Sequence, residues 1–159
     1  MEILKTTRES NVESLERRQL RELEASGLYV FHGSETDFEE LEPRQAIDTV
    51  IGNDEEPSVH ASQLADYAIF MAVAAPLGRT TAGSTSNGTN DSFRMKFSMQ
   101  SSVQQRLTDQ VSGLVYVLDK KDFVQRRPAE WISKKAVKPL FKVRVSKRDL
   151  PKDIEIFQS

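Results

Sequence analysis

Apolar and polar residues alternate along much of the C-terminal half of the chain. A period of two is typical of half-buried β-strands, and it predicts strands at 93–99 and 140–145. Residues 113–118 are apolar throughout, which indicates a central strand buried on both faces. Residues 130–133 begin another short strand, and 154–157 have the pattern of an edge strand.

A helical period governs the start of the chain. Ser10 and Glu13 have the spacing of a capping box, in which the serine accepts from a backbone amide and the glutamate reaches back. The predicted amphipathic helix runs to about residue 25, and Gly27 can end it in a left-handed conformation. Residues 1–9 are expected to form a flexible arm.

Two short strands and an apolar helix follow. Residues 28–34 begin with strongly strand-forming side chains, and residues 58–61 form a brief second strand. Ser62 can cap a helix over 63–74. This helix is apolar nearly all round, so we expect it to be buried, with its alanines permitting close packing.

Polar residues, glycine and proline interrupt the pattern in three places. Residues 36–39 offer a helix start that Pro43 should close, and residues 47–57 are typical of an acidic loop. Residues 75–92 show no apolar period, which predicts a mobile loop, either a binding lid or simple disorder. About seven short strands with early helices predict one α+β domain over 10–159 with mainly antiparallel sheets.

Length and composition narrow the class of protein. The 159 residues are 38% hydrophobic and 29% charged, and no apolar run approaches the roughly 20 residues that span a bilayer. The chain has no cysteine and two histidines, which excludes disulfides, thiolate chemistry and sulfur-based zinc sites. The first residues lack the features of a secretion signal. We therefore expect a cytoplasmic protein with no membrane partner and no metal.

Charge is distributed unevenly, although the net charge is only −2. Between residues 35 and 56 the charges are acidic except for Arg44, whereas between 120 and 152 they are mostly basic. Such asymmetry can mark the site of an anionic ligand or nucleic acid, and it is also typical of an ordinary solvated surface.

Three points at the ends of predicted strands carry candidate chemistry: His32, His60 and Glu130. Gly33 removes a side chain beside His32, so a flat ligand could reach the backbone there. Glu130 precedes Trp131, whose ring would withdraw the carboxylate from water and strengthen its attraction for hydroxyls and cations. The plainer interpretation is a hydrogen-bonded histidine in a turn and a solvent-facing glutamate.

In order and spacing, three short motifs resemble the catalytic core of ADP-ribosyltransferases. The motifs are His32-Gly33-Ser34, then Val59-His60-Ala61 followed by Ala65-Asp66-Tyr67, then Glu130-Trp131-Ile132. The nearest likeness is to the poly(ADP-ribose) polymerase and diphtheria-toxin branch, whose signature is a histidine, a tyrosine and a glutamate on three strands. RNA 2′-phosphotransferases share that fold. The resemblance covers residues 28–146 and implies split antiparallel β-sheets, with NAD as substrate.

The resemblance implies a role for each matching residue. His32 would hydrogen-bond a ribose hydroxyl of NAD, and Gly33 would bind the nicotinamide amide through its backbone. Ser34 would add a polar contact near the nicotinamide. Glu130 would hold the nicotinamide ribose and stabilise the positive charge that develops as the glycosidic bond breaks.

The aromatic part of the signature is altered. Tyr67 or Phe70 would supply a ring that stacks on nicotinamide. At the family's tyrosine the chain carries Val59, with His60 beside it, so one face of the nicotinamide sandwich is missing or replaced. His60 could stack or donate a proton there, or it could be a strand residue that faces solvent. The helical regulatory domain of the large polymerases has no counterpart, so chain-building is not expected.

Three functions are consistent with these patterns. The first is an NAD-dependent mono-ADP-ribosyltransferase or NAD glycohydrolase, with an unknown protein or nucleic-acid acceptor or water. The second is a non-catalytic module that binds ADP-ribose, a nucleotide or a partner protein. The third is RNA 2′-phosphotransfer, for which Arg44, Arg79 and Arg94 are the candidate cleft arginines. The first hypothesis requires that His32 and Glu130 face one shared cavity.

Overall fold

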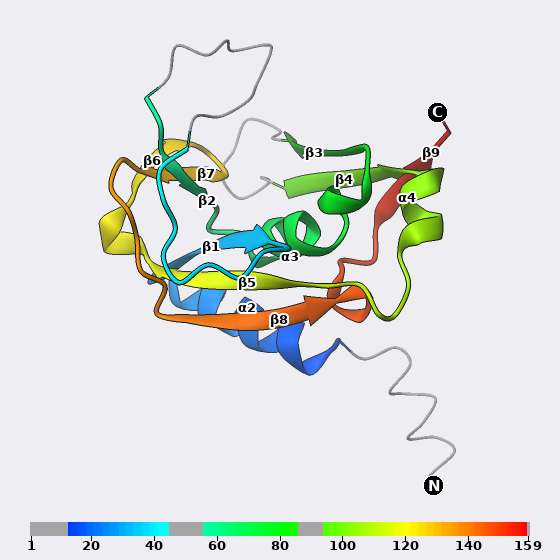
Figure 1. The fold of residues 1–159 in the computed structure, drawn as a ribbon, viewed down its shortest axis with the longest axis horizontal. Coiled ribbons are helices and arrows are strands. Elements are labelled where there is room, and N and C mark those ends of the chain that lie inside the picture. The colour runs from blue at the N-terminus through cyan, green and yellow to red at the C-terminus, as the bar shows by residue number, and fades with distance from the viewer. Residues whose placement is uncertain (1–12, 45–55, 86–93, 159) are drawn as a thin grey trace, which may run out of the picture.

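The computed structural model describes residues 13–44, 56–85 and 94–158. In this part of the chain the strands form three three-stranded sheets, and α-helices pack against them (Figure 1). The helices are α2 (Leu15–Ser26), α3 (Ala65–Val73) and α4 (Ser101–Arg106). The α+β class predicted from the sequence is confirmed.

The first sheet has the order β1-β5-β8 and is antiparallel throughout. Its strands are β1 (Tyr29–Ser34), β5 (Ser112–Asp119) and β8 (Phe141–Ser146). β5 is the middle strand and is buried at every position except its two ends, which confirms the prediction of a central strand. The register places His32 opposite Tyr116 and Gly33 opposite Val115.

The second sheet has the order β2-β7-β6, and within the described residues one backbone bridge links it to the first. It consists of β2 (Val59–Ala61), β7 (Glu130–Ser133) and β6 (Val124–Arg127). Phe31 of β1 and Ser62, just after β2, exchange two backbone hydrogen bonds of 2.7 and 2.9 Å. Because that pair is an isolated bridge, the two sheets separate on the side toward the end of β1.

The third sheet has the order β3-β4-β9. Its strands are β3 (Thr80–Thr85), β4 (Arg94–Gln100) and β9 (Ile154–Phe157). β9 is an edge strand as predicted, but it runs parallel to β4. β3 occupies part of the segment expected to be a loop, so that prediction is wrong for residues 80–85. Its mostly small, polar side chains carry no apolar period, and pairing with β4 supplies the order.

Helix α3 lies close against the first sheet, and two glycines make room for it. A Cβ atom at Gly33 would lie 1.9 Å from the backbone oxygen of Ala68, and one at Gly113 would lie 2.3 Å from that of Ala72. The other side of α3 faces the third sheet, where the rings of Phe70 and Phe97 lie 4.8 Å apart. The missing side chain at Gly33 is therefore required by helix packing, a reason that the local sequence did not reveal.

Of the two capping residues predicted for the first helix, the structure has the C-terminal one in α2 and a different residue at the N-terminus. Gly27 adopts φ 74° and donates its N–H to the carbonyl of Glu24, which confirms the left-handed cap. At the other end the N-cap is Ser14, whose hydroxyl accepts from the N–H of Arg17. Ser14 takes the position predicted for Ser10, which lies outside the described residues, as does the predicted arm at 1–9.

The start of α3 also differs from its prediction. The Ser62 hydroxyl accepts from the N–H of Leu64 and not from the helix itself. The first helical amide, that of Ala65, donates instead to the Glu24 carboxylate of α2 at 2.7 Å. A capping group supplied by another helix leaves no signal in the local sequence.

The segment between β1 and β2 is irregular where it is described. Residues 36–39, expected to start a helix, form none. The N–H of Phe38 donates to the Tyr116 hydroxyl at 2.6 Å, and Leu41 pairs with Val137 through backbone hydrogen bonds of 2.9 Å. These contacts, with Tyr116 of the first sheet and with Val137 in the segment before β8, override the local helix signals. Most of the predicted acidic loop at 47–57 lies outside the described residues.

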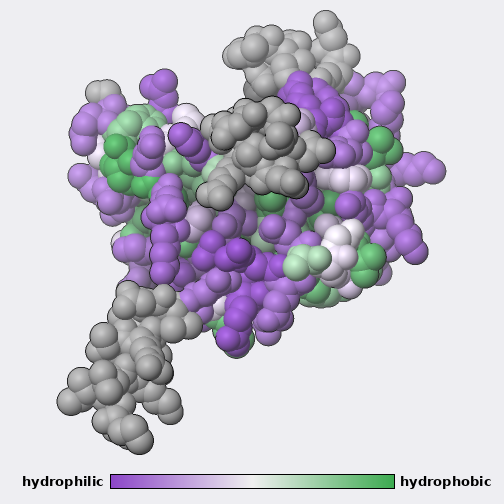
Figure 2. All heavy atoms as spheres, turned by 180° about the vertical axis from the view of Figure 1, so that it is seen from behind, coloured by the Kyte–Doolittle hydropathy of each residue, from purple (hydrophilic) through white to green (hydrophobic). Residues whose placement is uncertain are grey.

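The surface seen from behind is mainly hydrophilic, with small separate apolar patches (Figure 2). No helix within the described ranges combines the length and apolar character that a membrane span needs.

Candidate functional site

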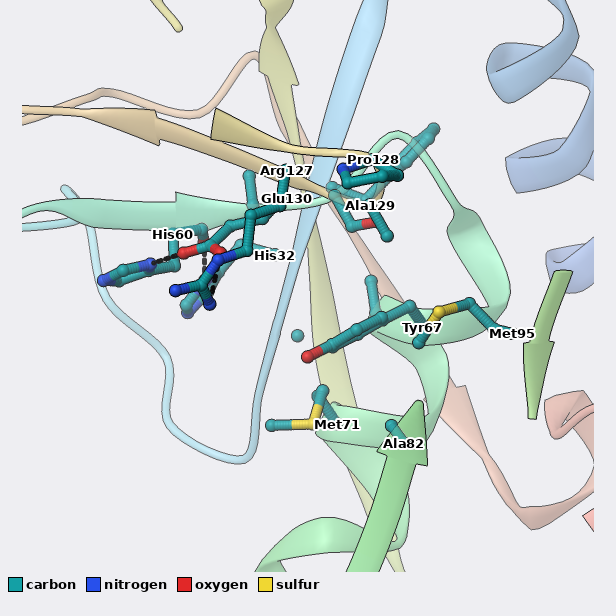
Figure 3. Close-up of a pocket in the computed structure, with 15 residues that line it drawn as sticks. His32, His60, Tyr67, Met71, Ala82, Met95, Arg127, Pro128, Ala129 and Glu130 are labelled. Carbon is teal, nitrogen blue, oxygen red and sulfur yellow. Dashed lines mark hydrogen bonds and ion pairs between the residues drawn. The ribbon is translucent and has the colours of Figure 1, made fainter. Parts of the chain in front are cut away.

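A cavity of about 560 Å³ opens where the first and second sheets separate (Figure 3). Its wall combines the end of β1, the start of α3 and the turn between β6 and β7. The predicted site residues that line it are His32, Gly33, His60, Tyr67 and Glu130. The chain thus brings together groups that lie almost 100 positions apart, and His32 and Glu130 share one hollow.

Two of the predicted site residues lie elsewhere. Ser34 lines an adjoining cavity of about 410 Å³, which also includes His32, Gly33 and His60 in its wall. Phe70 is fully buried in the core and lines neither cavity. Since a helix that is apolar all round gives no indication of which face meets a cavity, the sequence could not choose between Phe70 and Tyr67. The structure leaves Tyr67 as the ring in the site.

Gly33 turns its backbone amide and carbonyl toward the gap between the sheets. In an antiparallel pair, every second residue of a strand forms backbone hydrogen bonds with its neighbour strand. The Leu28 carbonyl accepts from the N–H of Lys120, so Val30 and His32 also bond toward β5. Phe31 bonds to Ser62 on the opposite side, and Gly33, two residues on, has the same orientation as Phe31. The result is one donor and one acceptor side by side at the cavity wall.

The His32 side chain keeps the two sheets apart at this point. An antiparallel pairing that continued beyond Phe31 and Ser62 would place Gly33 opposite His60. The ring nitrogen Nδ1 of His32 instead hydrogen-bonds the His60 carbonyl at 2.6 Å. The carbonyl of His60 is thereby occupied, and among the described residues no backbone hydrogen bond closes the gap at Gly33.

His32 is held as a neutral imidazole. Burial lowers its pKa because it disfavours the charged ring, and electrostatic interactions with the His60 and Arg44 side chains act in the same direction. The hydrogen bond to the His60 carbonyl opposes these effects without reversing them. Since a carbonyl only accepts, Nδ1 carries the proton and Nε2 keeps a lone pair that can accept from a hydroxyl.

Glu130, the first residue of β7, is surrounded by cationic and imidazole groups. Its Oε1 lies 3.0 Å from Nδ1 of His60 and 3.6 Å from Arg126, and its Oε2 lies 3.3 Å from Arg127. The side chain is 23% exposed, so the carboxylate still reaches the cavity. A carboxylate has about four lone-pair sites, which leaves room for a further donor.

The expectation that the Trp131 ring shields Glu130 is wrong. Adjacent residues in a strand point to opposite faces. Accordingly, the Trp131 indole N–H donates to Gln63 at 3.1 Å, and the ring lies under the ammonium group of Lys120. The immediate surroundings of Glu130 are polar.

Tyr67 extends from α3 into the cavity, with Met71 and Met95 beside it (Figure 3). Burial raises the pKa of its phenol, and the negative charge of Glu130 adds to the effect. The hydroxyl therefore remains protonated near neutral pH and is available as a donor. The ring and the two thioethers provide an apolar wall suited to a flat group.

Sequence reasoning did not identify Arg126 and Arg127 as site residues. The turn Pro128–Ala129 links β6 to β7 and places Arg127 directly opposite Glu130 in the register. The Pro128 carbonyl accepts from the amide side chain of Gln63 at 2.6 Å, which ties this turn to the start of α3. A proline between two short strands was the available signal for the hairpin.

Within the described residues, no group of three or more histidine, aspartate or glutamate side chains is placed to hold a metal ion.

Comparison with known proteins gives no relative for this chain: no family model, no curated protein and no solved structure matches it.

Proposed function

We propose that this protein cleaves NAD at the bond between nicotinamide and ribose and passes ADP-ribose to an acceptor or to water. The separated sheets would correspond to the split sheet of ADP-ribosyltransferases. The observation that carries the proposal is the backbone amide and carbonyl of Gly33 facing a cavity that also contains His32 and Glu130.

Nicotinamide fits the first part of this site. Its carboxamide has one acceptor oxygen and a donor NH₂, which match the N–H and C=O of Gly33 as a neighbouring strand would. The aromatic face of Tyr67 offers a stacking surface in the same cavity. The chain has Val59 where a second aromatic residue would stack on nicotinamide, so the nicotinamide ring would be bound less tightly.

The ribose would lie between His32 and Glu130. Nε2 of His32 accepts from one hydroxyl, and the Glu130 carboxylate accepts from another. When the C1′–N bond breaks, its electron pair leaves with nicotinamide and positive charge develops on the ribose. A fixed carboxylate stabilises that charge, an effect worth about 10²–10³ in rate for a single well-placed polar group. The acceptor bonds to C1′ as nicotinamide leaves, and it loses its proton.

A specific observation favours the alternative of a non-catalytic binding module. The Glu130 carboxylate already contacts His60 and both arginines of β6. These contacts reduce the negative charge it could offer to a developing cation. A module of this kind would hold ADP-ribose or a nucleotide in the same cavities without breaking a bond.

RNA 2′-phosphotransfer has less support. Arg44 lines the adjoining cavity, but Arg79 lines neither cavity, and the side chain of Arg94 lies outside the described part of the chain.

The test is release of nicotinamide from NAD by the wild-type protein, by Glu130→Gln and by a control, Glu155→Gln, which changes an exposed carboxylate on β9. We expect release by wild type and control, and at least about a hundredfold slower release by Glu130→Gln. A thermal shift with ADP-ribose in the absence of release would indicate the binding module. No response to any nucleotide would contradict the whole site assignment.

A further inference from the structure

His60 occupies the boundary between the two adjoining cavities. It lines both, whereas Glu130 lines only the larger one and Ser34 only the smaller one. Its side chain is 31% exposed, so a ligand can reach it. Its backbone carbonyl accepts the hydrogen bond from the His32 ring, which leaves the side chain for another role.

The two ring nitrogens of His60 have different surroundings. Nδ1 lies 3.0 Å from Oε1 of Glu130. Because an ionised carboxylate only accepts, Nδ1 carries a proton, and in the neutral ring the lone pair is therefore on Nε2. In Figure 3 the ring extends away from Glu130, with the second nitrogen turned away from Tyr67. A carboxylate that fixes the tautomer and orientation of an imidazole in this way makes Nε2 a proton acceptor.

The other candidate bases are already engaged. Nδ1 of His32 is bonded to a carbonyl, its burial disfavours the protonated ring, and its Nε2 is the group that meets the ribose. Glu130 is shared among three cationic or imidazole neighbours. His60 is the remaining imidazole of the cavity wall, and its contact with Glu130 uses only Nδ1.

We infer that His60 is the general base that takes the proton from a hydroxyl or water acceptor, with Glu130 as its positioning residue. The inference rests on the proposed function. With nicotinamide against Gly33 and Tyr67, the acceptor approaches C1′ from the smaller cavity. Its oxygen bonds to C1′ as the C1′–N bond breaks, nicotinamide leaves with the electron pair, and the acceptor proton moves to Nε2 of His60 before release to solvent.

Several charged or titratable groups from the neighbouring elements face His60 or the cavities it lines, and each can affect its titration. They are Glu130 from β7, Arg126 and Arg127 from β6, His32 from β1, Tyr67 from α3, and Glu35, Glu40, Glu42 and Arg44 from the segment after β1. A pH profile of wild type alone would not separate them. The comparison has to be made between variants that differ only at residue 60.

His60→Asn is the informative variant because its amide NH₂ lies near the position of Nδ1 and can still donate to Glu130, while the base at Nε2 is lost. We expect nicotinamide release to fall about a hundredfold with the Kd for NAD changed less than threefold. The rate should depend less on pH in the variant than in wild type, because the titratable base at residue 60 is gone while the other groups of the site remain. In His60→Ala, added imidazole should restore part of the rate.

The outcomes separate the two proposals. Release by wild type with His60→Asn within twofold of it, or with the pH dependence unchanged, overturns the role of His60 and leaves NAD cleavage standing. Failure of imidazole to restore any activity to a folded His60→Ala protein also counts against the base. Absence of release by wild type at every pH overturns the proposed function and this inference together.

Discussion

Replacement of Gly33 by alanine tests the close packing of α3 on the first sheet. The added Cβ would lie 1.9 Å from the Ala68 oxygen and 2.9 Å from the Ala72 nitrogen, both backbone atoms of α3. A flexible side chain could move aside, but a helix backbone cannot. To restore normal contact, α3 would have to move by more than about 1 Å away from the sheet.

Such a movement would disturb the most buried part of the molecule. Ile69 and Val73 on α3 are both 0% exposed. Overpacking of a well-packed core costs about 1–3 kcal/mol, and we expect Gly33→Ala to lower the free energy of unfolding by at least that amount. A helix that moves also carries Tyr67 with it, so binding in the cavity should weaken as well.

Urea unfolding followed by circular dichroism measures the effect. The matched control is Gly83→Ala on β3, where a Cβ would meet nothing within 4 Å. The control should change the free energy of unfolding by no more than about 0.5 kcal/mol, or increase it slightly, because alanine loses less backbone entropy than glycine. If Gly33→Ala is as stable as wild type, α3 is not held against β1 as described.

Two further predictions concern capping and pH. Glu24→Ala removes the carboxylate that accepts from the N–H of Ala65 and so caps α3. It should lower the free energy of unfolding, measured in urea titrations, by about 1 kcal/mol. An unchanged urea midpoint would show that this contact does not stabilise the fold. Folding lowers the pKa of His32, so at acidic pH the unfolded chain binds a proton more readily than the folded chain does. The contribution of His32 to the free energy of unfolding should therefore be fully present above the ordinary histidine pKa of 6.5. It should decrease as the pH falls through that value toward the lower pKa of the folded state. The free energy of unfolding at several pH values should show a smaller decrease for His32→Gln than for wild type, and identical decreases would mean that His32 is not held neutral.

The sequence predicted best those elements in which local pattern and tertiary environment agree. The alternating strand β8, the uniformly apolar β5 and the glycine that ends α2 each follow from a single local rule. The predicted helix at 36–39 failed because Phe38 bonds to the Tyr116 hydroxyl across the sheet. β3 was missed because its order comes from pairing with β4.

The sequence predicted several residues of the candidate site correctly, but it did not predict which groups surround them. His32 and Glu130 were expected to share a cavity, and they do. The neighbours of Glu130 were wrong, because the β6–β7 hairpin brings Arg127 across from it, and a single sequence shows neither the register nor the turn. For Gly33 the sequence missed a packing requirement, because the contact that requires glycine comes from α3, about 35 positions farther along the chain.

The most direct test of the nicotinamide site is an NMR titration that follows the backbone amide of Gly33 while nicotinamide is added to the wild-type protein. The account predicts a saturable downfield shift of the Gly33 amide proton, as expected for a new hydrogen bond to the carboxamide oxygen, with no shift at Gly27, which ends α2 and lines neither cavity. A Gly33 resonance that stays in place at millimolar nicotinamide, or that moves no more than that of Gly27, would contradict it.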